Sequence, residues 1–332
     1  MDKDVRQKKY DYIRALAILS VVLMHLCAHV KAEPFGIKWW IVSAVMLFTS
    51  TCNGLFFLLS GRFNLNLKNS NDLIRFYKKR AVSIVIPFLV CSFICFIVEN
   101  RLLGIGNDYI TSLISVFPTT HYWFAYELIG LIVWTPFFAV MMDGLDLKKK
   151  CLMTALVLVL QTVFVFIKDV GAYPGYEVPL LGWPLFYLVG SFADDIPDRW
   201  RKWIIISGVC CFITSLLQMR LLPDASHGLQ DLSPKYFFSV LAVYYILLNV
   251  SLPEGIEKAA LFLSQYSYYI YLFHNTVIMI FFSERLDVYD YLINKTGTIL
   301  FLLIVFIASI GLSVVLGIMV KKIISVVFKK IV

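Results

Sequence analysis

Long apolar blocks constrain this 332-residue sequence more than any other feature. Hydrophobic residues make up 60% of the chain, its mean hydropathy is +0.78, and only 16% of its residues are charged. A soluble domain typically carries about 45–50% apolar and about 25% charged residues. The blocks run for roughly 17–23 residues, the length that a helix needs to cross a hydrocarbon core of about 30 Å. We expect an all-α integral membrane protein, because a backbone in lipid must satisfy its own hydrogen bonds.

About ten of these blocks are expected to be transmembrane helices of one domain that covers residues 1–332. Their approximate ranges are 12–30, 41–60, 81–98, 121–142, 151–168, 179–193, 203–219, 236–251, 261–283 and 298–320. The first block does not resemble a cleavable signal peptide, because no small-residue cleavage pattern follows it. No internal repeat is evident, so the inverted repeats of many transporters are not indicated.

The distribution of basic residues predicts the orientation of the chain. With the N-terminus inside, most of the 30 Lys and Arg residues fall on inner segments, so both termini are expected in the cytoplasm. The net charge of +8 is then a topology signal that also suits anionic lipid head groups, and it requires no nucleic-acid partner. The seven cysteines form no CxxC pair, and we expect neither a metal site nor a disulfide framework.

The first block carries three ionisable side chains, Arg14, His25 and His29. Arg14 and His25 are expected to share one helix face, about 20° apart around the axis and about 16 Å apart along it. His29 follows His25 by four residues and should lie one turn further out. Ionisable groups inside a membrane are costly and usually functional, although a buried histidine can also be a structural group.

Two further polar residues are expected at a similar depth. Glu127 is predicted to be the only acidic residue within the hydrophobic part of a block, and His274 lies in the ninth block. With His25 they suggest one intramembrane polar site, because a lone buried carboxylate must be paired or protonated. The alternative for each residue is a hydrogen bond that packs one helix against another.

Four cations stand at the inner end of the third block, Arg75, Lys78, Lys79 and Arg80. Such a cluster can anchor the helix at the cytoplasmic interface. It can also bind a cytosolic phosphate compound together with Arg14, because Arg and Lys both bind phosphate strongly. The pattern leaves both interpretations open.

Taken in order, the motifs resemble those of the bacterial membrane acyltransferase family 3. Its R-x10-H pattern is matched by Arg14 and His25, and its FF-x-x-SG pattern by Phe56, Phe57, Ser60 and Gly61. Later motifs are matched by Lys79, Arg80 and Pro87, by Trp123, Phe124 and Pro136, and by Ser267, Ile270, Tyr271, Leu272 and His274. Ser83 stands where the family commonly has a second arginine. The resemblance covers nearly the whole chain.

In length and layout the chain is most similar to the stand-alone O-acetyltransferases of surface polysaccharides, such as the enterobacterial common antigen branch. This resemblance implies a multi-pass enzyme of the bacterial inner membrane that uses acetyl-CoA as co-substrate and no metal. Arg14, Arg80 and Lys79, with Ser60 nearby, are then expected to bind the donor. His25 would act as a general base or carry the acetyl group briefly, with Glu127 and His274 as further catalytic candidates.

The acceptor is expected to be a glycan or a lipid-linked sugar, bound by Trp123, Tyr126 and Tyr271. Aromatic residues at this depth are also a normal interfacial belt. Acyl transfer creates an oxyanion that needs a hydrogen-bond donor, and Ser60, Tyr271 and His274 are candidates.

Two other classes of protein remain as alternatives. A proton-coupled secondary transporter would use His25, Glu127 and His274 as a relay, and a sensor or scaffold would perform no chemistry. Thermal stabilisation by coenzyme A discriminates between them, because only the enzyme is expected to show it.

Overall fold

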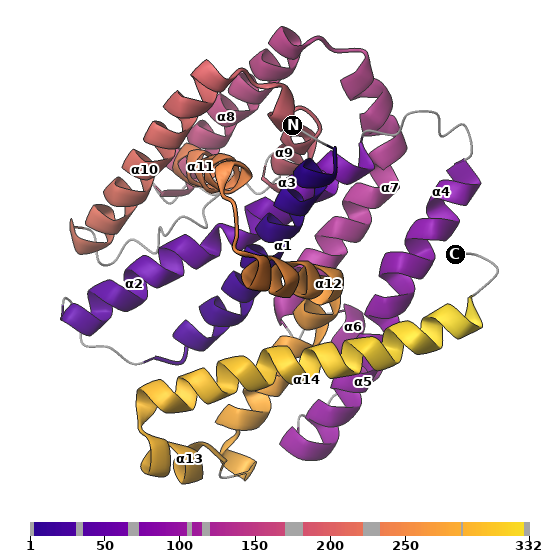
Figure 1. Cartoon of the computed structure of the whole chain (residues 1–332), viewed down its shortest axis with the longest axis vertical. Coiled ribbons are helices and arrows are strands. Elements are labelled where there is room, and N and C mark those ends of the chain that lie inside the picture. Colours follow the sequence, from indigo (N-terminus) through magenta and orange to yellow (C-terminus); the bar gives the residue numbers. More distant parts are fainter. Residues whose placement is uncertain are drawn as a thin grey trace. The chain divides into compact units, whose positions relative to one another are not determined.

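All regular structure in the described part of the chain is helical (Figure 1). The computed structural model describes residues 3–30, 36–65, 73–104, 108–114, 120–169, 182–221, 233–286 and 288–328. Within these ranges, seven helical segments are long and apolar enough to cross a membrane. They are Lys8–Cys27, Ile37–Asn64, Leu73–Leu102, Trp123–Asp143, Leu147–Ile167, Asp198–Met219 and Thr298–Val327. The expected class, an all-α integral membrane protein, is confirmed.

The chain divides into two compact units, each made of two stretches of sequence. The first unit contains residues Met1–Asn69 and Leu131–Leu261, and the second contains Ser70–Gly130 and Phe262–Val332. Two helices contribute residues to both units, α7 (Trp123–Asp143) and α12 (Glu254–Phe282).

The first unit is built around α1 (Lys3–Cys27), which packs against α2 (Ile37–Ser50) and α3 (Cys52–Asn64). Its other helices are α8 (Leu147–Asp169), α9 (Trp183–Gly190), α10 (Asp198–Leu221) and α11 (Pro234–Asn249). The sixth expected block, 179–193, contains only the eight-residue helix α9, and residues 179–181 lie outside the described residues. Gly182, with a φ of 83°, precedes this short helix, and Pro184 lies in its first turn.

Helices α3 and α9 approach each other at the level of their backbones. A Cβ atom on Gly61 would lie 1.7 Å from the carbonyl oxygen of Tyr187, and one on Gly190 would lie 2.0 Å from the carbonyl oxygen of Leu58. Only glycine fits at either position, and small residues at such crossings are typical of membrane helix pairs. The glycine of the FF-x-x-SG pattern is therefore a packing requirement of the first unit.

The second unit is built around one long helical element that changes its winding twice. It begins with α4 (Leu73–Arg80), continues through a π-helical turn at Ala81–Val85 into α5 (Ile86–Val98), and ends in a second π-helical turn at Glu99–Leu103. Pro87 lacks the N–H that an α-helix would donate to the Ser83 carbonyl, which accounts for the widened first turn. The second turn ends at Gly104, which has a φ of 72°.

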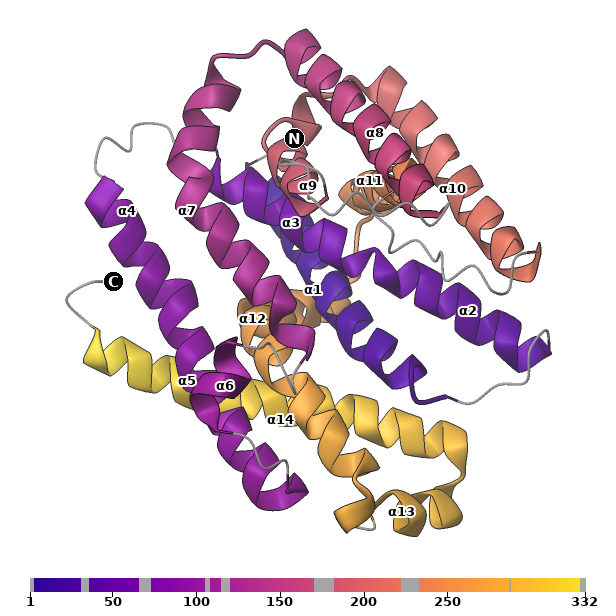
Figure 2. The same ribbon diagram turned by 180° about the vertical axis from the view of Figure 1, so that it is seen from behind.

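The second unit also contains α6 (Tyr109–Ile114), the first part of α7, the last part of α12, α13 (Val288–Thr296) and α14 (Thr298–Val327). Helix α14 packs against α5 (Figure 2). Gly317 of α14 faces Tyr269 of α12, where an added Cβ would lie 2.6 Å from the tyrosine Cβ.

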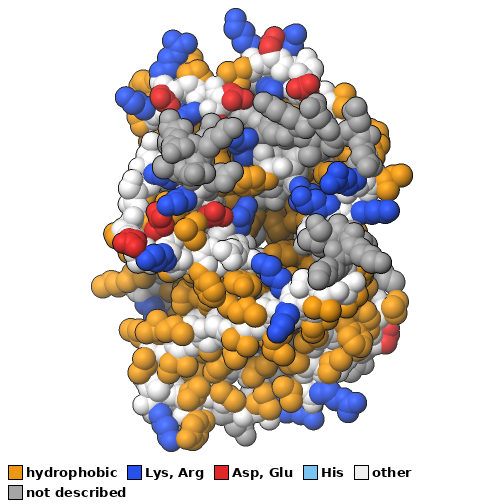
Figure 3. All heavy atoms as spheres, turned by 45° about the vertical axis from the view of Figure 1, so that its right-hand side comes forward, with side chains coloured by type: hydrophobic (Ala, Val, Ile, Leu, Met, Phe, Trp, Pro, Cys, Tyr) orange, Lys and Arg blue, Asp and Glu red, His pale blue; other side chains and the backbone are white. Residues whose placement is uncertain are grey.

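Large hydrophobic side chains lie exposed on several of the long helices. Ile307 on α14 is 61% exposed and Phe166 on α8 is 66% exposed. A space-filling view shows hydrophobic side chains gathered over a broad part of the face that it displays (Figure 3). Such surfaces are unfavourable in water, and they fit helices that face lipid.

Candidate active site

Helix α1 carries Arg14 and His25 without a break between them. The regular helix places them on nearly one face, about 16 Å apart along the axis. Both side chains are half-buried. The Arg14 guanidinium lies 3.0 Å from the Asp11 carboxylate and 5.4 Å from the centre of the Phe63 ring on α3. The predicted spacing of this pair therefore holds in the structure.

His29 lies just beyond this helix. Helix α1 ends at Cys27, and His29 lies exposed in the following turn, where its backbone N–H donates to the Leu26 carbonyl at 3.0 Å. The helix is thus shorter than the expected block 12–30, and the alignment of His29 with Arg14 and His25 stays a prediction.

Near the Arg14 end of α1, a second arginine forms an ion pair that the sequence did not reveal. Arg62 Nε lies 2.6 Å from Asp194 Oδ2, and the Asp194 side chain is only 6% exposed. The Tyr244 hydroxyl donates to Asp194 Oδ1 at 3.0 Å, and the Tyr10 hydroxyl also bonds to this carboxylate. The network joins α1, α3 and α11 through Asp194, so it fixes the backbone beside Arg14.

The first turns of α1 are also tied to the start of α12. Lys8 Nζ lies 2.6 Å from Glu257 Oε1, and the Tyr12 hydroxyl donates to the same carboxylate. The hydrogen bond from Lys8 lowers the pKa of Glu257 below its ordinary value. These contacts hold the N-terminal turns of α1 in place within the first unit.

The remaining predicted cations belong to the second unit. Arg80 ends α4 half-buried, with its guanidinium 5.6 Å from the centre of the Phe76 ring, and Lys79 beside it is exposed. Ser60, like Arg14 and His25, belongs to the first unit, where it is half-buried on α3. A joint donor site formed by residues of both units stays a prediction.

His274 is completely buried at the centre of a polar and aromatic cluster on α12. Its Nδ1 lies 2.7 Å from the Tyr271 carbonyl oxygen and 3.1 Å from that of Ile270. A carbonyl oxygen can only accept, so Nδ1 carries the proton and Nε2 keeps a lone pair in the neutral ring. This tautomer is the one required of a base that acts through Nε2.

Tyr271 and His121 complete this cluster. The rings of His121 and His274 lie 5.3 Å apart, edge to face, and His121 is 2% exposed. The Tyr271 hydroxyl donates to the His121 carbonyl oxygen. The structure thus brings together the predicted pair Tyr271 and His274. The cluster also contains His121, the first residue of the expected block 121–142, to which the sequence pattern assigned no role.

Three predicted residues at the start of α7 lie in different surroundings. Trp123 and Tyr126 are half-buried, and the Tyr126 hydroxyl donates to the Leu113 carbonyl. Glu127 is exposed, so the structure does not place it in the buried cluster around His274. The catalytic and acceptor-binding roles of these three side chains stay predictions.

Glu99 is a buried carboxylate that sequence reasoning missed. The expected third block ended at residue 98, but the π-helical turn continues the helix to Leu103 and carries Glu99 within it. Glu99 is 3% exposed and accepts a hydrogen bond from Thr276 Oγ1 at 2.7 Å. The expectation that Glu127 is the only acidic residue within a membrane helix is therefore wrong. The spacing of four residues from Cys91 to Cys95 to Glu99 was the available signal.

Comparison with known proteins identifies the family. A family model described as an acyltransferase domain matches residues 7–318, which is nearly the whole chain. The chain belongs to the acyltransferase 3 family. No curated protein and no solved structure matches it. The protein is therefore a membrane acyltransferase, and Arg14, His25, Glu99 and His274 all lie within the matched range.

An acyltransferase needs a base for the acceptor hydroxyl and a donor for the oxyanion. In this acyltransferase, the buried His274 has the tautomer of a base, and His25 lies on the helix that carries Arg14. The Tyr271 proton is already donated to a backbone carbonyl, which disfavours Tyr271 as the oxyanion donor. Among the described residues, no three His, Cys, Asp or Glu side chains lie close enough together to hold a metal ion.

Proposed function

We propose that this acyltransferase moves an acetyl group from cytosolic acetyl-CoA to a hydroxyl of a surface glycan or a lipid-linked sugar precursor in the bacterial inner membrane. The observation that carries the proposal is the uninterrupted helix between Arg14 and His25. Arg14 and His25 lie about 16 Å apart along the helix axis, and this separation suits the long pantetheine arm of coenzyme A. The coenzyme phosphates then lie at the Arg14 end, and the thioester lies within the membrane.

The donor site uses the cations predicted at the cytoplasmic face. Arg14 and Arg80 bind the coenzyme phosphates, with Lys79 as an additional point charge. Ser60 lies one helical turn before Asn64, the last residue of α3, and the Phe63 ring of that turn contacts Arg14. This position favours Ser60 as a donor-side residue, and Ser60 remains one of the candidates for the hydrogen bond to the oxyanion.

The chemistry proceeds at the thioester carbonyl. His25 takes the proton from the acceptor hydroxyl, the hydroxyl oxygen attacks the carbonyl carbon, and the C–S bond breaks. The proton then passes from the imidazolium to the departing thiolate, which leaves as the free thiol of coenzyme A. In a two-step variant, the imidazole nitrogen attacks first and carries the acetyl group until the acceptor displaces it.

The acceptor is assigned to the outer end of the membrane. Trp123, Tyr126 and Tyr271 supply aromatic surface for a sugar ring, and Glu127 orients its hydroxyl. His274 is the second candidate for the general base, because its Nε2 keeps a lone pair within the buried cluster. The two substrates thus enter from opposite faces, and only the acetyl group crosses the membrane.

Arg14→Ala and Arg80→Ala are each expected to weaken coenzyme A binding by roughly 10- to 100-fold, the loss typical of a hydrogen bond to a charged group. Dephospho-coenzyme A should be less sensitive to one of the two changes. Arg14→Lys should restore binding only partly, because lysine lacks the planar fork. Thermal stabilisation of the solubilised protein by coenzyme A measures the affinity, with the exposed Arg199→Ala on α10 as control. Unchanged affinity in both variants would remove these cations from the donor site.

Sidedness tests the proposed function directly. In oriented vesicles, acetyl-CoA supplied only on the cytoplasmic side should acetylate an impermeant sugar acceptor supplied only on the outer side. Transfer of radiolabelled acetyl groups is the measurement. Transfer that occurs only with both substrates on the cytoplasmic side would contradict the proposal.

A further inference from the structure

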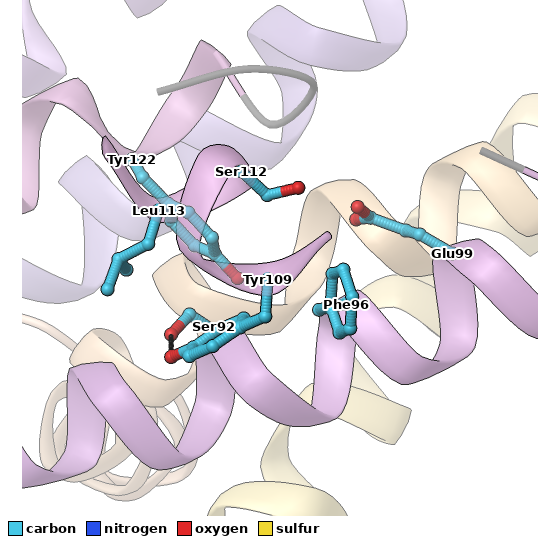
Figure 4. A pocket seen from close by; sticks show the side chains of 7 residues that line it. All are labelled: Ser92, Phe96, Glu99, Tyr109, Ser112, Leu113 and Tyr122. Atoms are coloured by element: carbon cyan, nitrogen blue, oxygen red, sulfur yellow. Dashed lines mark hydrogen bonds between the residues drawn. The ribbon is translucent and has the colours of Figure 1, made fainter. Parts of the chain in front are cut away.

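A small space beside Glu99 in the second unit has polar and aromatic walls (Figure 4). Its volume of about 20 Å³ gives room for about one water molecule, which Glu99 and Ser112 in its lining can bind. An organic ring does not fit there. The nucleotide end of a cytosolic donor therefore needs an open surface, and the adjoining ends of α1 and α3 in the first unit supply one.

Phe63 lies in the last turn of α3, and it is 44% exposed. Its ring centre lies 5.4 Å from Arg14 Cζ on α1, and Arg62 precedes it in the chain. Charged side chains so close to the ring place it outside the hydrocarbon layer, because a charge in lipid is costly. By the predicted topology this end of α3 faces the cytosol. The exposed part of the ring is thus accessible to a water-soluble ligand.

Tyr10 on α1 holds the Phe63 ring in place. The two ring centres lie 5.5 Å apart, with the ring planes at 87° to each other. The Tyr10 hydroxyl bonds to the buried Asp194 carboxylate. Arg62 pairs with the same carboxylate at 2.6 Å, and its Cζ lies 5.6 Å from the centre of the Tyr10 ring. Phe63 therefore differs from an isolated hydrophobic residue on a surface, because its surroundings are already ordered before a ligand arrives.

A planar base attached to phosphates matches this surface. Nucleobases stack on aromatic rings and on the planes of arginine guanidinium groups. Arginine also binds phosphate oxygens through charge-assisted hydrogen bonds. Coenzyme A carries its adenine and its phosphates at one end and the thiol at the other. The Phe63 ring contacts Arg14, whereas His25 lies about 16 Å further along α1, so the two ends of the coenzyme correspond to the two ends of this helix face.

We propose that Phe63, together with the Arg14 guanidinium, forms the platform on which the adenine ring of the donor stacks. This assignment rests on the proposed function, because it takes the base to be that of an acyl-coenzyme A. It also specifies the class of donor. Carriers that have the phosphopantetheine arm but no base, such as an acyl carrier protein, lack the group that the platform binds.

Isothermal titration calorimetry on the solubilised full-length protein tests the platform with three probes. Adenosine 3′,5′-bisphosphate has the base and phosphates but no arm, phosphopantetheine has the arm but no base, and inorganic pyrophosphate has only the charge. Adenosine 3′,5′-bisphosphate is expected to bind more tightly than pyrophosphate, because only the nucleotide can stack.

Substitutions of Phe63 then locate the binding. Phe63→Leu should weaken the binding of adenosine 3′,5′-bisphosphate and of coenzyme A by roughly 5- to 150-fold, the loss typical of one stacked base. Its affinity for phosphopantetheine should stay at the wild-type value. Phe63→Trp should retain nucleotide binding, because an indole ring also offers an aromatic face.

The matched control is Phe262→Leu on α12. Phe262 is 47% exposed, and its ring centre lies 5.2 Å from that of Tyr266, so it resembles Phe63 in exposure and in its aromatic neighbour. This variant should bind every probe as the wild type does. The thermal midpoint without ligand shows whether each variant is folded. Phe63→Met, which keeps a similar volume, replaces Phe63→Leu if that variant fails to fold.

The outcomes separate this inference from the proposed function. Absence of adenosine 3′,5′-bisphosphate binding to the wild type, or equal binding by a folded Phe63→Leu variant, overturns the platform. Absence of acetyl transfer from acetyl-CoA by the wild type overturns the proposed function, whereas nucleotide binding that depends on Phe63 still establishes the platform. With both intact, the KM for acetyl-CoA should rise in Phe63→Leu while the acceptor KM stays unchanged.

Discussion

His25→Ala is expected to lower the rate of acetyl transfer by about 10²- to 10⁴-fold, the usual loss when a general base is removed. His25 lies on nearly the same face of α1 as Arg14, and in the proposed donor site their separation places His25 beside the thioester. The variant should remain folded, because His25 is only half-buried and lies near the end of α1. Initial rates with radiolabelled acetyl-CoA measure the effect.

The matched control is His29→Ala. His29 is exposed in the turn after α1, so its removal should leave the rate within about twofold of wild type. Coenzyme A should stabilise both variants equally, since neither histidine touches the phosphates in the proposed site. A His25→Ala enzyme that keeps more than a tenth of the wild-type rate would exclude His25 as the base.

Gly61→Val is expected to prevent the first unit from folding. Its Cβ would lie 1.7 Å from the Tyr187 carbonyl oxygen, so α3 and α9 must separate. Overpacking typically costs about 1–3 kcal/mol, and more where the obstacle is backbone that cannot rotate away. Size-exclusion chromatography of the solubilised protein and its thermal midpoint measure the loss.

Gly311→Ala provides the control for this change. Gly311 lies within α14, and no atom would lie within 4 Å of an added Cβ. Replacing glycine by alanine in a helix generally stabilises it by roughly 0.5–1 kcal/mol. A Gly61→Val protein with a wild-type midpoint would show that α3 and α9 do not need their close approach.

Helix positions and the local spacing of residues could be read from the sequence, because both depend on neighbours in the chain. The apolar blocks predicted the helices, and the interval from Arg14 to His25 holds because α1 is continuous. The end of that helix was not predictable from hydropathy, and His29 falls beyond it. Apolar residues extend beyond the last hydrogen bond of α1, so hydropathy alone does not show where that helix ends.

Contacts between distant parts of the chain were not predictable in the same way. The pairing of Arg62 with Asp194 joins residues that are far apart in sequence. Glu99 was missed because its burial depends on a π-helical turn, a change of winding with a weak sequence signature. The resemblance to the family named candidate residues, but it could not show which of them share a cluster.

The first π-helical turn determines the rotational phase of α5. Over the 19 positions from Arg80 to Glu99, an unbroken α-helix would leave the two residues about 100° apart around the axis. Residues in a π-turn advance less, because its hydrogen bonds span five residues. One row of buried positions accordingly steps by five from Val82 to Pro87, and then by four through Cys91 and Cys95 to Glu99.

The first π-helical turn therefore accommodates one extra residue without changing which side of the helix carries Glu99. Loss of one residue from Ala81–Val85 would let this segment return to regular α-helical winding, with a step of four in place of the step of five from Val82 to Pro87. Loss of two residues would have no such compensation, because each α-helical residue advances by about 100°. We therefore expect a one-residue deletion at this turn to keep Glu99 buried and a longer deletion to turn it away.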